Sequence, residues 1–156
     1  MNAVYYQSPV GPLTLIEENG ALTGVQFGRA PLPAGCRAAE TPLLSRARRQ
    51  LWEYFEGKRT EFDLPLAPAG TPFRRAVWAA MARIPYGQTA TYGQLAAAVG
   101  SPRAARAVGG ACHANPIAIL LPCHRVVGST GSLTGFAGGL PVKEQLLALE
   151  AAHSAP

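Results

Sequence analysis

The alternation of apolar and polar residues at the start of the chain predicts a small antiparallel sheet. Runs rich in valine, tyrosine, threonine, leucine and isoleucine cover residues 3–8, 12–18 and 21–27, and such residues favour strands. Asn19-Gly20 separates the second run from the third, and this dipeptide tolerates the positive φ that a tight hairpin turn requires. We therefore expect a three-stranded antiparallel meander.

A helix is predicted next, after a loop rich in proline and glycine at 28–40. Apolar residues recur at helical spacing over 41–55. Thr41 before Pro42 is a typical N-cap followed by a first-turn proline, and Gly57 ends the pattern. We expect this helix to cover one face of the sheet.

The rest of the chain has mostly helical patterns. In chain order, helices are expected from Thr71 to the stop at Ile84-Pro85, over 91–99, over 101–113 and from about Val142. Gly100 joins the second and third of these, and Ser101 before Pro102 is the N-cap candidate of the third. Two short helices around a glycine turn are typical of a helix-turn-helix unit. An apolar strand at 117–121 and a mobile glycine-rich loop at 128–139 complete the predicted elements.

The proline-rich, uncharged segment 64–70 predicts a domain boundary. We expect an N-terminal sheet-plus-helix domain over 1–70 and a mostly helical domain with the helix-turn-helix over 71–156. The predicted fold class is therefore α+β.

Charge distinguishes the two predicted domains. The chain of 156 residues carries a net charge of +5, yet basic and acidic side chains balance within 1–70. From Thr71 to Lys143 there are seven cations and no Asp or Glu: Arg74, Arg75, Arg83, Arg103, Arg106, Arg125 and Lys143. A stretch without acids is typical of a surface that meets phosphates, although basic side chains can also merely solubilise a face. We expect nucleic acid as the partner.

Composition excludes several classes of protein. No apolar run approaches the roughly 20 residues that a membrane span needs, and the first residues lack the features of a signal peptide, so we expect a cytoplasmic protein without a membrane partner. The three cysteines, Cys36, Cys112 and Cys123, are odd in number and form no C-x-x-C pair. This pattern argues against a disulfide framework and a zinc site, and we expect no metal or cofactor.

The candidate chemistry lies in the segment 121–127, where Cys123 and His124 follow an apolar run and a proline. A neighbouring imidazole is the commonest device for producing a reactive thiolate near neutral pH. This position predicts a half-buried thiol at the rim of a core, although a lone cysteine is more often a small core residue. On a helical wheel Glu150 falls among the apolar residues of the last helix, where a carboxylate needs a partner. His124 is the nearest one, which gives a Cys-His-Glu triad.

These residues resemble the O6-alkylguanine-DNA alkyltransferase family, also called methylated-DNA:protein-cysteine methyltransferases. The similarity rests on Pro122-Cys123-His124-Arg125-Val126 and, in the same order and spacing, on 106–111, Asn115-Pro116, 138–140, Lys143-Glu144 and 146–150. It implies a ribonuclease-H-like N-terminal domain and a winged-helix-like C-terminal domain. The implied reaction is one irreversible transfer of the alkyl group from O6 of guanine, with O4-alkylthymine as a second possible substrate, to Cys123.

The resemblance also implies a role for each matching residue. His124 is the base that takes the thiol proton through a water, Glu150 orients it, Asn115 hydrogen-bonds into the network, and Tyr92 protonates guanine N3. The implied substrate pocket comprises Cys112, Val126, Phe136, Ala137 and Lys143. Arg106 enters the duplex in place of a flipped nucleotide, and Arg103, Ala104, Ala105 and Tyr92 contact the minor groove. The expected partner is double-stranded DNA that contains O6-alkylguanine, bound by a monomer, and cooperative binding is left open.

The sequence departs from the family pattern in the pocket loop, where Phe136-Ala137 replaces the usual Tyr followed by a small residue and Thr134 can crowd the pocket. Two alternatives remain at this point. A cysteine hydrolase with the same triad would need an oxyanion hole, and a lesion-sensing DNA-binding protein would need no triad.

Overall fold

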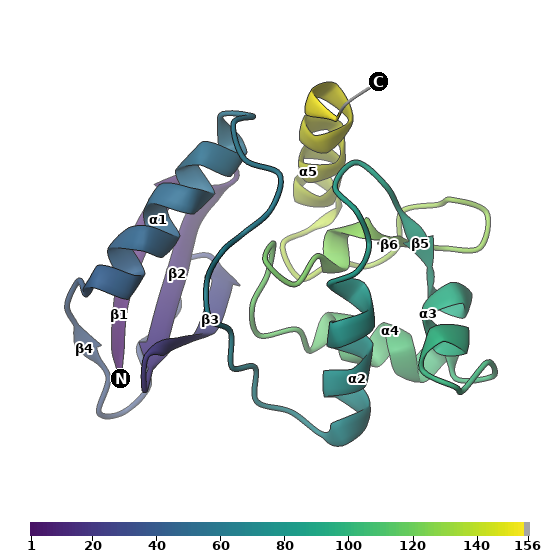
Figure 1. The fold of residues 1–156 in the computed structure, drawn as a ribbon, viewed down its shortest axis with the longest axis horizontal. Coiled ribbons are helices and arrows are strands. Elements are labelled where there is room, and N and C mark those ends of the chain that lie inside the picture. The colour runs from purple at the N-terminus through teal and green to yellow at the C-terminus, as the bar shows by residue number, and fades with distance from the viewer. Residues whose placement is uncertain (155–156) are drawn as a thin grey trace. The chain divides into compact units, whose positions relative to one another are not determined.

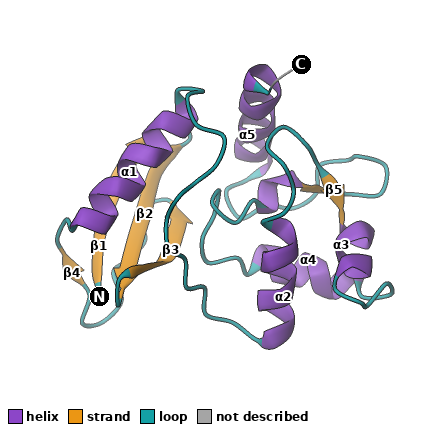
Figure 2. Cartoon of the chain, viewed as in Figure 1, coloured by secondary structure: helices purple, strands orange, loops and turns teal. Residues whose placement is uncertain are grey.

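The computed structural model describes residues 1–154, which divide into two compact units. One unit contains 1–69 together with the short segment 116–118, and the other contains 70–115 and the chain from 119 onward. The first combines a sheet with a helix and the second is mostly helical, so the predicted α+β fold class is confirmed (Figures 1 and 2).

The first unit contains the predicted meander. Strands β1 (Asn2–Ser8), β2 (Gly11–Glu18) and β3 (Ala21–Phe27) pair antiparallel in sequence, and helix α1 (Pro42–Phe55) lies over the sheet (Figure 1). The turn at Asn19-Gly20 has φ of 52° and 79°, as expected for this dipeptide. The predicted loop at 28–40 contains one element that the sequence did not indicate, the two-residue strand β4 (Arg37–Ala38) parallel to β1.

The free edge of β3 is covered by two segments that come from far along the chain. Leu22 exchanges backbone hydrogen bonds with 65–67, and Val25 does so with 116–118, at 2.8–2.9 Å. An uncovered edge strand would present unpaired backbone groups. The chain therefore enters the first unit at residue 116 and leaves it again only five residues before Cys123.

The second unit is built from short helices around a buried tryptophan. Its elements are α2 (Pro72–Met81), β5 (Ala90–Thr91), α3 (Tyr92–Ala98), α4 (Ala105–His113), the 3-10 turn η1 (Cys123–Arg125), β6 (Val126–Val127) and α5 (Leu140–His153). Trp78 is 1% exposed, and its indole N–H donates to the carbonyl of Ala111 at 2.8 Å. This bond ties α2 to α4, just before Cys112.

The predicted helix over 101–113 begins four residues later than expected. Gly100 has a φ of 78° and follows the end of α3. The N–H groups of Gly100 and Ser101 donate to Ala97 and Ala96, which is the Schellman motif that closes a helix. Ser101 is thus part of the end of α3 and not the N-cap of α4, so that interpretation was wrong.

The predicted strand over 117–121 was also wrong. Ile117 and Ala118 are the bridge residues beside β3, and Ile119 then turns the chain with a φ of 72°. All five residues are at most 8% exposed. The run is apolar because it is buried, and burial alone does not distinguish a strand from an irregular segment.

Candidate active site

The turn η1 fixes three consecutive reactive or charged side chains inside the second unit. Pro122 precedes the turn, and its carbonyl accepts the backbone N–H of Arg125 at 2.9 Å. Cys123, His124 and Arg125 are 7%, 0% and 7% exposed. The sequence predicted a half-buried thiol, so the cysteine lies deeper than expected.

The last helix brings Glu150 to His124. Their Nε2 and Oε2 atoms are 2.6 Å apart, and both side chains are fully buried. Burial lowers the pKa of the His124 imidazole, Glu150 opposes this shift, and the positive charges of Arg125 and Lys143 reinforce it. The imidazole is therefore neutral near pH 7 and able to accept a proton. Its Nδ1 is buried and has no hydrogen-bond partner among the described residues.

Arg125 also binds Glu150, which the sequence analysis did not anticipate. Its Nε donates to Oε1 at 2.7 Å and its Nη2 to Oε2 at 3.1 Å, while Nη1 donates to the carbonyl of Ile84 at 2.7 Å. A signal was present: a buried carboxylate has more acceptor sites than one histidine can satisfy.

Asn115 lies beside the sulfur of Cys123. Its side-chain amide donates to Sγ at 3.2 Å and to the carbonyl of Leu121 at 2.8 Å. Burial raises the pKa of the Cys123 thiol, and the Asn115 hydrogen bond and the charge of Lys143 partly offset that rise. At neutral pH the thiol form predominates at rest, so transfer requires a base that removes the proton during reaction.

Lys143 is a buried cation beneath the glycine-rich loop. It is 1% exposed, and its Nζ donates to the carbonyl of Val126 at 2.6 Å and lies 3.5 Å from that of Thr134. Its Nζ is 5.9 Å from the centre of the Phe136 ring. The structure thus brings Lys143, Val126 and Phe136 together, whereas Ala137 is exposed.

A cavity of about 420 Å³ opens between α3, α4 and the glycine-rich loop. Its lining contains three of the predicted residues and four others: Tyr92, Ala105, Arg106, Gly109, His113, Thr134 and Gly135. The hydroxyls of Tyr92 and Thr134 are 2.5 Å apart, so Thr134 does face into this region. Burial raises the pKa of Tyr92, which keeps its hydroxyl protonated and able to donate.

The other predicted site residues, Cys123 among them, do not line this cavity, and three of them have not been placed so far. Arg103 is exposed in the turn before α4, and Ala104 precedes the helix without a side-chain cap. Cys112 is buried with its Sγ 3.6 Å from the sulfur of Met81. Burial raises the pKa of Cys112 to about 12, so this thiol is unreactive near neutral pH.

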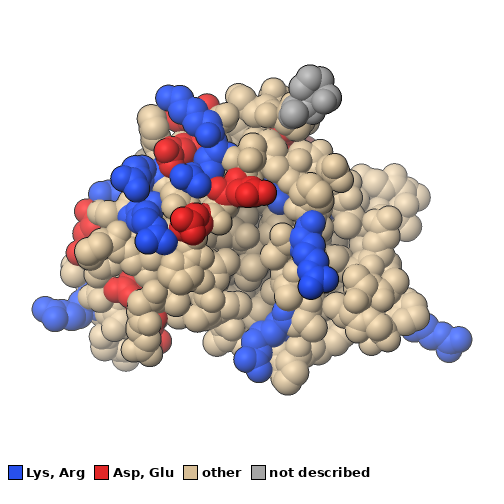
Figure 3. Space-filling view, viewed as in Figure 1, with Lys and Arg blue, Asp and Glu red and all other residues tan. Residues whose placement is uncertain are grey.

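The structure changes the picture of the acid-free stretch. Arg125 and Lys143 are buried within the site, so two of the seven cations are not available on the surface. The other five are exposed. On the face that Figure 3 shows, acidic and basic side chains mix over the first unit, while basic ones predominate over the second.

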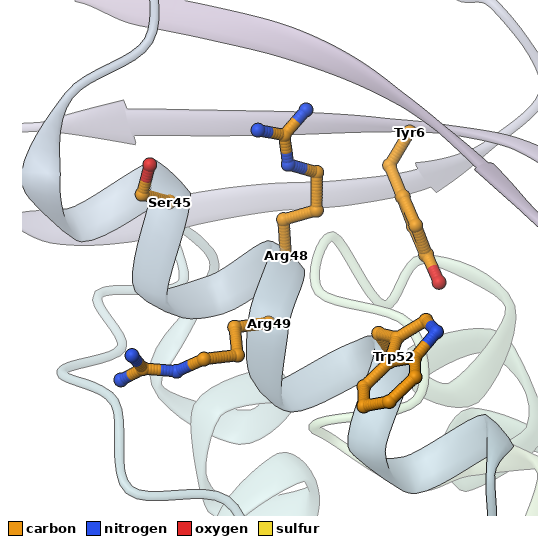
Figure 4. Close-up of a pocket in the computed structure, with 5 residues that line it drawn as sticks. All are labelled: Tyr6, Ser45, Arg48, Arg49 and Trp52. Carbon is orange, nitrogen blue, oxygen red and sulfur yellow. The ribbon is translucent and has the colours of Figure 1, made fainter.

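A second cavity, of about 350 Å³, lies in the first unit and contains none of the predicted site residues. It is lined by Tyr6, Ser45, Arg48, Arg49 and Trp52 (Figure 4). Arg48 forms an ion pair with Glu40, and Lys58 lies 5.1 Å from the centre of the Trp52 ring. Arg48 and Lys58 therefore already interact with side chains of the first unit.

No cluster of three or more His, Cys, Asp or Glu side chains within 1–154 could hold a metal ion. None of the helices described is long and apolar enough to cross a membrane.

Comparison with known families shows to which family the chain belongs. Residues 72–152 match the model of the 6-O-methylguanine DNA methyltransferase DNA-binding domain, and residues 1–68 match that of the ribonuclease-like domain of the same proteins. The chain belongs to the 6-O-methylguanine DNA methyltransferase family. The resemblance inferred from the motif around Cys123 is therefore confirmed, and it extends through both halves of the chain.

Individual members of the methyltransferase family are similar over nearly their whole length. The methylated-DNA–protein-cysteine methyltransferase of Methanosarcina barkeri is 48% identical over 94% of this chain and 97% of that protein. The constitutive enzyme of Bacillus subtilis is 43% identical over 92% of each. The crystal structure of Mycobacterium tuberculosis OGT in complex with DNA superimposes with a TM-score of 0.93 at 43% identity, covering 99% of this chain and 95% of that one.

Proposed function

We propose that this protein repairs alkylated DNA by transferring the alkyl group from O6 of guanine directly and irreversibly to Cys123. The observation that carries the proposal is that two hydrogen-bonded pairs meet at adjacent residues of η1: Glu150 with His124 at 2.6 Å, and Asn115 with the Cys123 sulfur at 3.2 Å. A DNA-binding protein without chemistry needs none of these side chains. Family membership supports the same reaction.

The chemistry can be written from these residues. The Cys123 proton passes to Nδ1 of His124, and a water between Sγ and this otherwise unpartnered nitrogen would satisfy both atoms. The thiolate sulfur bonds to the alkyl carbon as the bond from that carbon to O6 breaks. Tyr92, protonated at neutral pH, donates its proton to N3 of the departing guanine. The proton that His124 gained returns through water to the Tyr92 phenolate, so the products are an S-alkylcysteine and a dealkylated guanine. No step regenerates the thiol.

The cavity beside α4 is the proposed entry for the damaged nucleotide. A pocket nucleophile cannot reach O6 while the base is stacked, so the nucleotide must leave the duplex. Arg106 and Ala105 line the cavity together with Tyr92, which supports Arg106 as the side chain that replaces the flipped base. The small residues of α4 allow close approach to the minor groove. Arg103 and Ala104 directly precede the first residue of α4.

We also propose substrate contacts for Cys112, Val126, Phe136, Ala137 and Lys143, and action as a monomer on double-stranded DNA. Of these five residues, Lys143, Val126 and Phe136 have the strongest structural support, because the Lys143 ammonium contacts both the Val126 carbonyl and the Phe136 ring. The division into domains at residue 70 stays a prediction; the compact units, with 116–118 returning to the first, are in keeping with it.

Intact mass measurement tests the proposal. The protein is mixed with duplex DNA that contains O6-methylguanine, and we expect a gain of one methylene mass on Cys123 that stops at one equivalent. Cys123→Ser should abolish the gain and keep binding to undamaged duplex, with Cys36→Ser as the matched control that retains transfer. No adduct on the wild type would support a lesion-sensing binder, and repeated turnover of an ester would support a hydrolase.

A further inference from the structure

Hydrogen bonds to Glu150 and Ile84 hold the Arg125 side chain in one orientation. Its side chain is 8% exposed, and each of its three nitrogens donates a hydrogen bond, two to Glu150 and one to the carbonyl of Ile84. The Tyr86 ring lies 5.7 Å from the guanidinium carbon. A two-point contact between a guanidinium and a carboxylate fixes both groups in position and plane.

This contact determines which way the neighbouring proton must point. A guanidinium can only donate and stays charged at all accessible pH values, so both oxygens of Glu150 act as acceptors. The backbone N–H of Gly87 also donates to Oε1, at 3.3 Å. At the 2.6 Å contact with Oε2, therefore, Nε2 of His124 must be the donor. In a neutral imidazole the lone pair is then on Nδ1, the nitrogen without a protein partner.

We propose that Arg125 is a positioning residue for alkyl transfer, because it keeps Glu150 an obligatory acceptor and so keeps the basic lone pair of His124 on Nδ1. The inference rests on the proposed function, in which His124 takes the thiol proton. Without the guanidinium, the buried carboxyl group can hold a proton and donate it to Nε2. The imidazole proton would then be on Nδ1, and no nitrogen would face the thiol as a base.

The pH dependence follows from the charges around this pair. Glu150 and Lys143 come from α5, Arg125 and Cys123 from η1, and Tyr86 from the loop before β5. Arg125 lowers the pKa of His124, and a nearby cation also favours the ionised form of a carboxyl group. Removing this cation makes the pair of Glu150 and His124 bind a proton more readily. The acid limb of the transfer rate, where the pair gains a proton, then moves to higher pH.

The test compares two substitutions that separate charge from geometry. Arg125→Gln keeps N–H donors and loses the charge, whereas Arg125→Lys keeps the charge and loses the two-point contact. Single-turnover rates on free O6-benzylguanine are measured from pH 5.5 to 9, so that DNA binding does not contribute. For Arg125→Gln we expect the acid limb to move up by about one pH unit, so that the loss at low pH exceeds the loss at high pH about tenfold. Arg125→Lys should keep the wild-type limb with a lower plateau.

Arg83→Gln is the matched control, because Arg83 is an exposed arginine of the same unit, and its profile should equal that of the wild type. A purely structural role for Arg125 would lower the Arg125→Gln rate equally at every pH, and that outcome would overturn the inference. If the wild type itself forms no adduct on Cys123, the proposed function fails instead.

A spectroscopic measurement tests the inference on the wild-type protein first. The chain has three histidines, so the ring nitrogens of His124 can be assigned in a ¹⁵N-labelled sample. We expect the wild-type spectrum at pH 7.5 to show a neutral ring protonated on Nε2, and folded Arg125→Gln to show a growing share of the Nδ1-protonated form. A wild-type ring protonated on Nδ1 would contradict the proposal even if Arg125→Gln failed to fold.

Discussion

The buried titratable residues of this site depend on one another. Glu150, His124 and Arg125 are all buried, and each would be costly to bury alone. Together, Glu150 accepts hydrogen bonds from His124 and Arg125 at 2.6–3.1 Å. Buried ion pairs often add little net stability, but removing one partner leaves an uncompensated charge. The set therefore couples the stability of the second unit to the chemistry of Cys123.

That coupling gives a prediction about stability. Glu150→Gln leaves the Arg125 guanidinium buried without its carboxylate and should lower the free energy of unfolding by about 3–5 kcal/mol. Adding Arg125→Met to Glu150→Gln removes both charges and should recover most of the loss that either change causes alone. Urea unfolding of the single and double variants measures this interaction energy. Losses that simply add would show that the two side chains do not stabilise each other.

At the same scale, the sequence predicted part of the site. The helical wheel placed Glu150 on the buried face, and the need for a partner pointed to His124. The sequence predicted Arg125 to be one of the cations that face nucleic acid, because a count of charges along the chain does not show which side chains are buried. Arg125 becomes the second partner of Glu150 because η1 turns its side chain inward. A turn of three residues is too short to leave a hydrophobic periodicity in the sequence.

Among the elements, capping residues were the most informative sequence signals. Thr41 and Thr71 each accept the backbone N–H three residues later and begin α1 and α2. The errors occurred where local patterns have two meanings. Ser101 before Pro102 looks like a cap although its N–H closes the preceding helix, and strands of two residues such as β5 and β6 are too short to leave a pattern.

Helix α4 offers a test of its proposed place against DNA. Gly110 lies inside the helix, and a Cβ built there meets no atom within 4 Å. Gly110→Ala should therefore raise the free energy of unfolding by about 0.5–1 kcal/mol, since glycine weakens a helix interior. If this face approaches the minor groove closely, the same change should weaken duplex binding and leave transfer from free O6-benzylguanine intact. Unchanged duplex affinity would place the DNA elsewhere on the helix.

At the scale of the whole molecule, the cations of the second unit fall into an exposed group and a buried group. Five exposed arginines of the second unit are available to phosphates, while Arg125 and Lys143 act inside it. Neutralising a phosphate releases counterions, so binding should weaken steeply as salt rises, with a slope of about 0.9 for each contact in a plot of log affinity against log salt.

Arg106 should behave differently from an arginine that only contacts phosphate. Because it lines the cavity beside Tyr92, Arg106→Ala should slow repair in duplex DNA by about tenfold or more, in line with the few kcal/mol that base flipping requires. The loss on free O6-benzylguanine should be smaller. Arg75→Ala, on the exposed side of α2, is the control and should alter only the affinity for duplex. Equal losses of Arg106→Ala on both substrates would argue against a role in flipping.

The two units can be distinguished by the fluorescence of their tryptophans. Trp52 belongs to the first unit and is 47% exposed, whereas Trp78 belongs to the second and is 1% exposed with its indole bonded to Ala111. Indole emission shifts to the red in water, so the native spectrum is the sum of a red and a blue component. Heating or denaturant should therefore report the loss of the second unit as a red shift, and the order in which the two halves melt can be followed without a label.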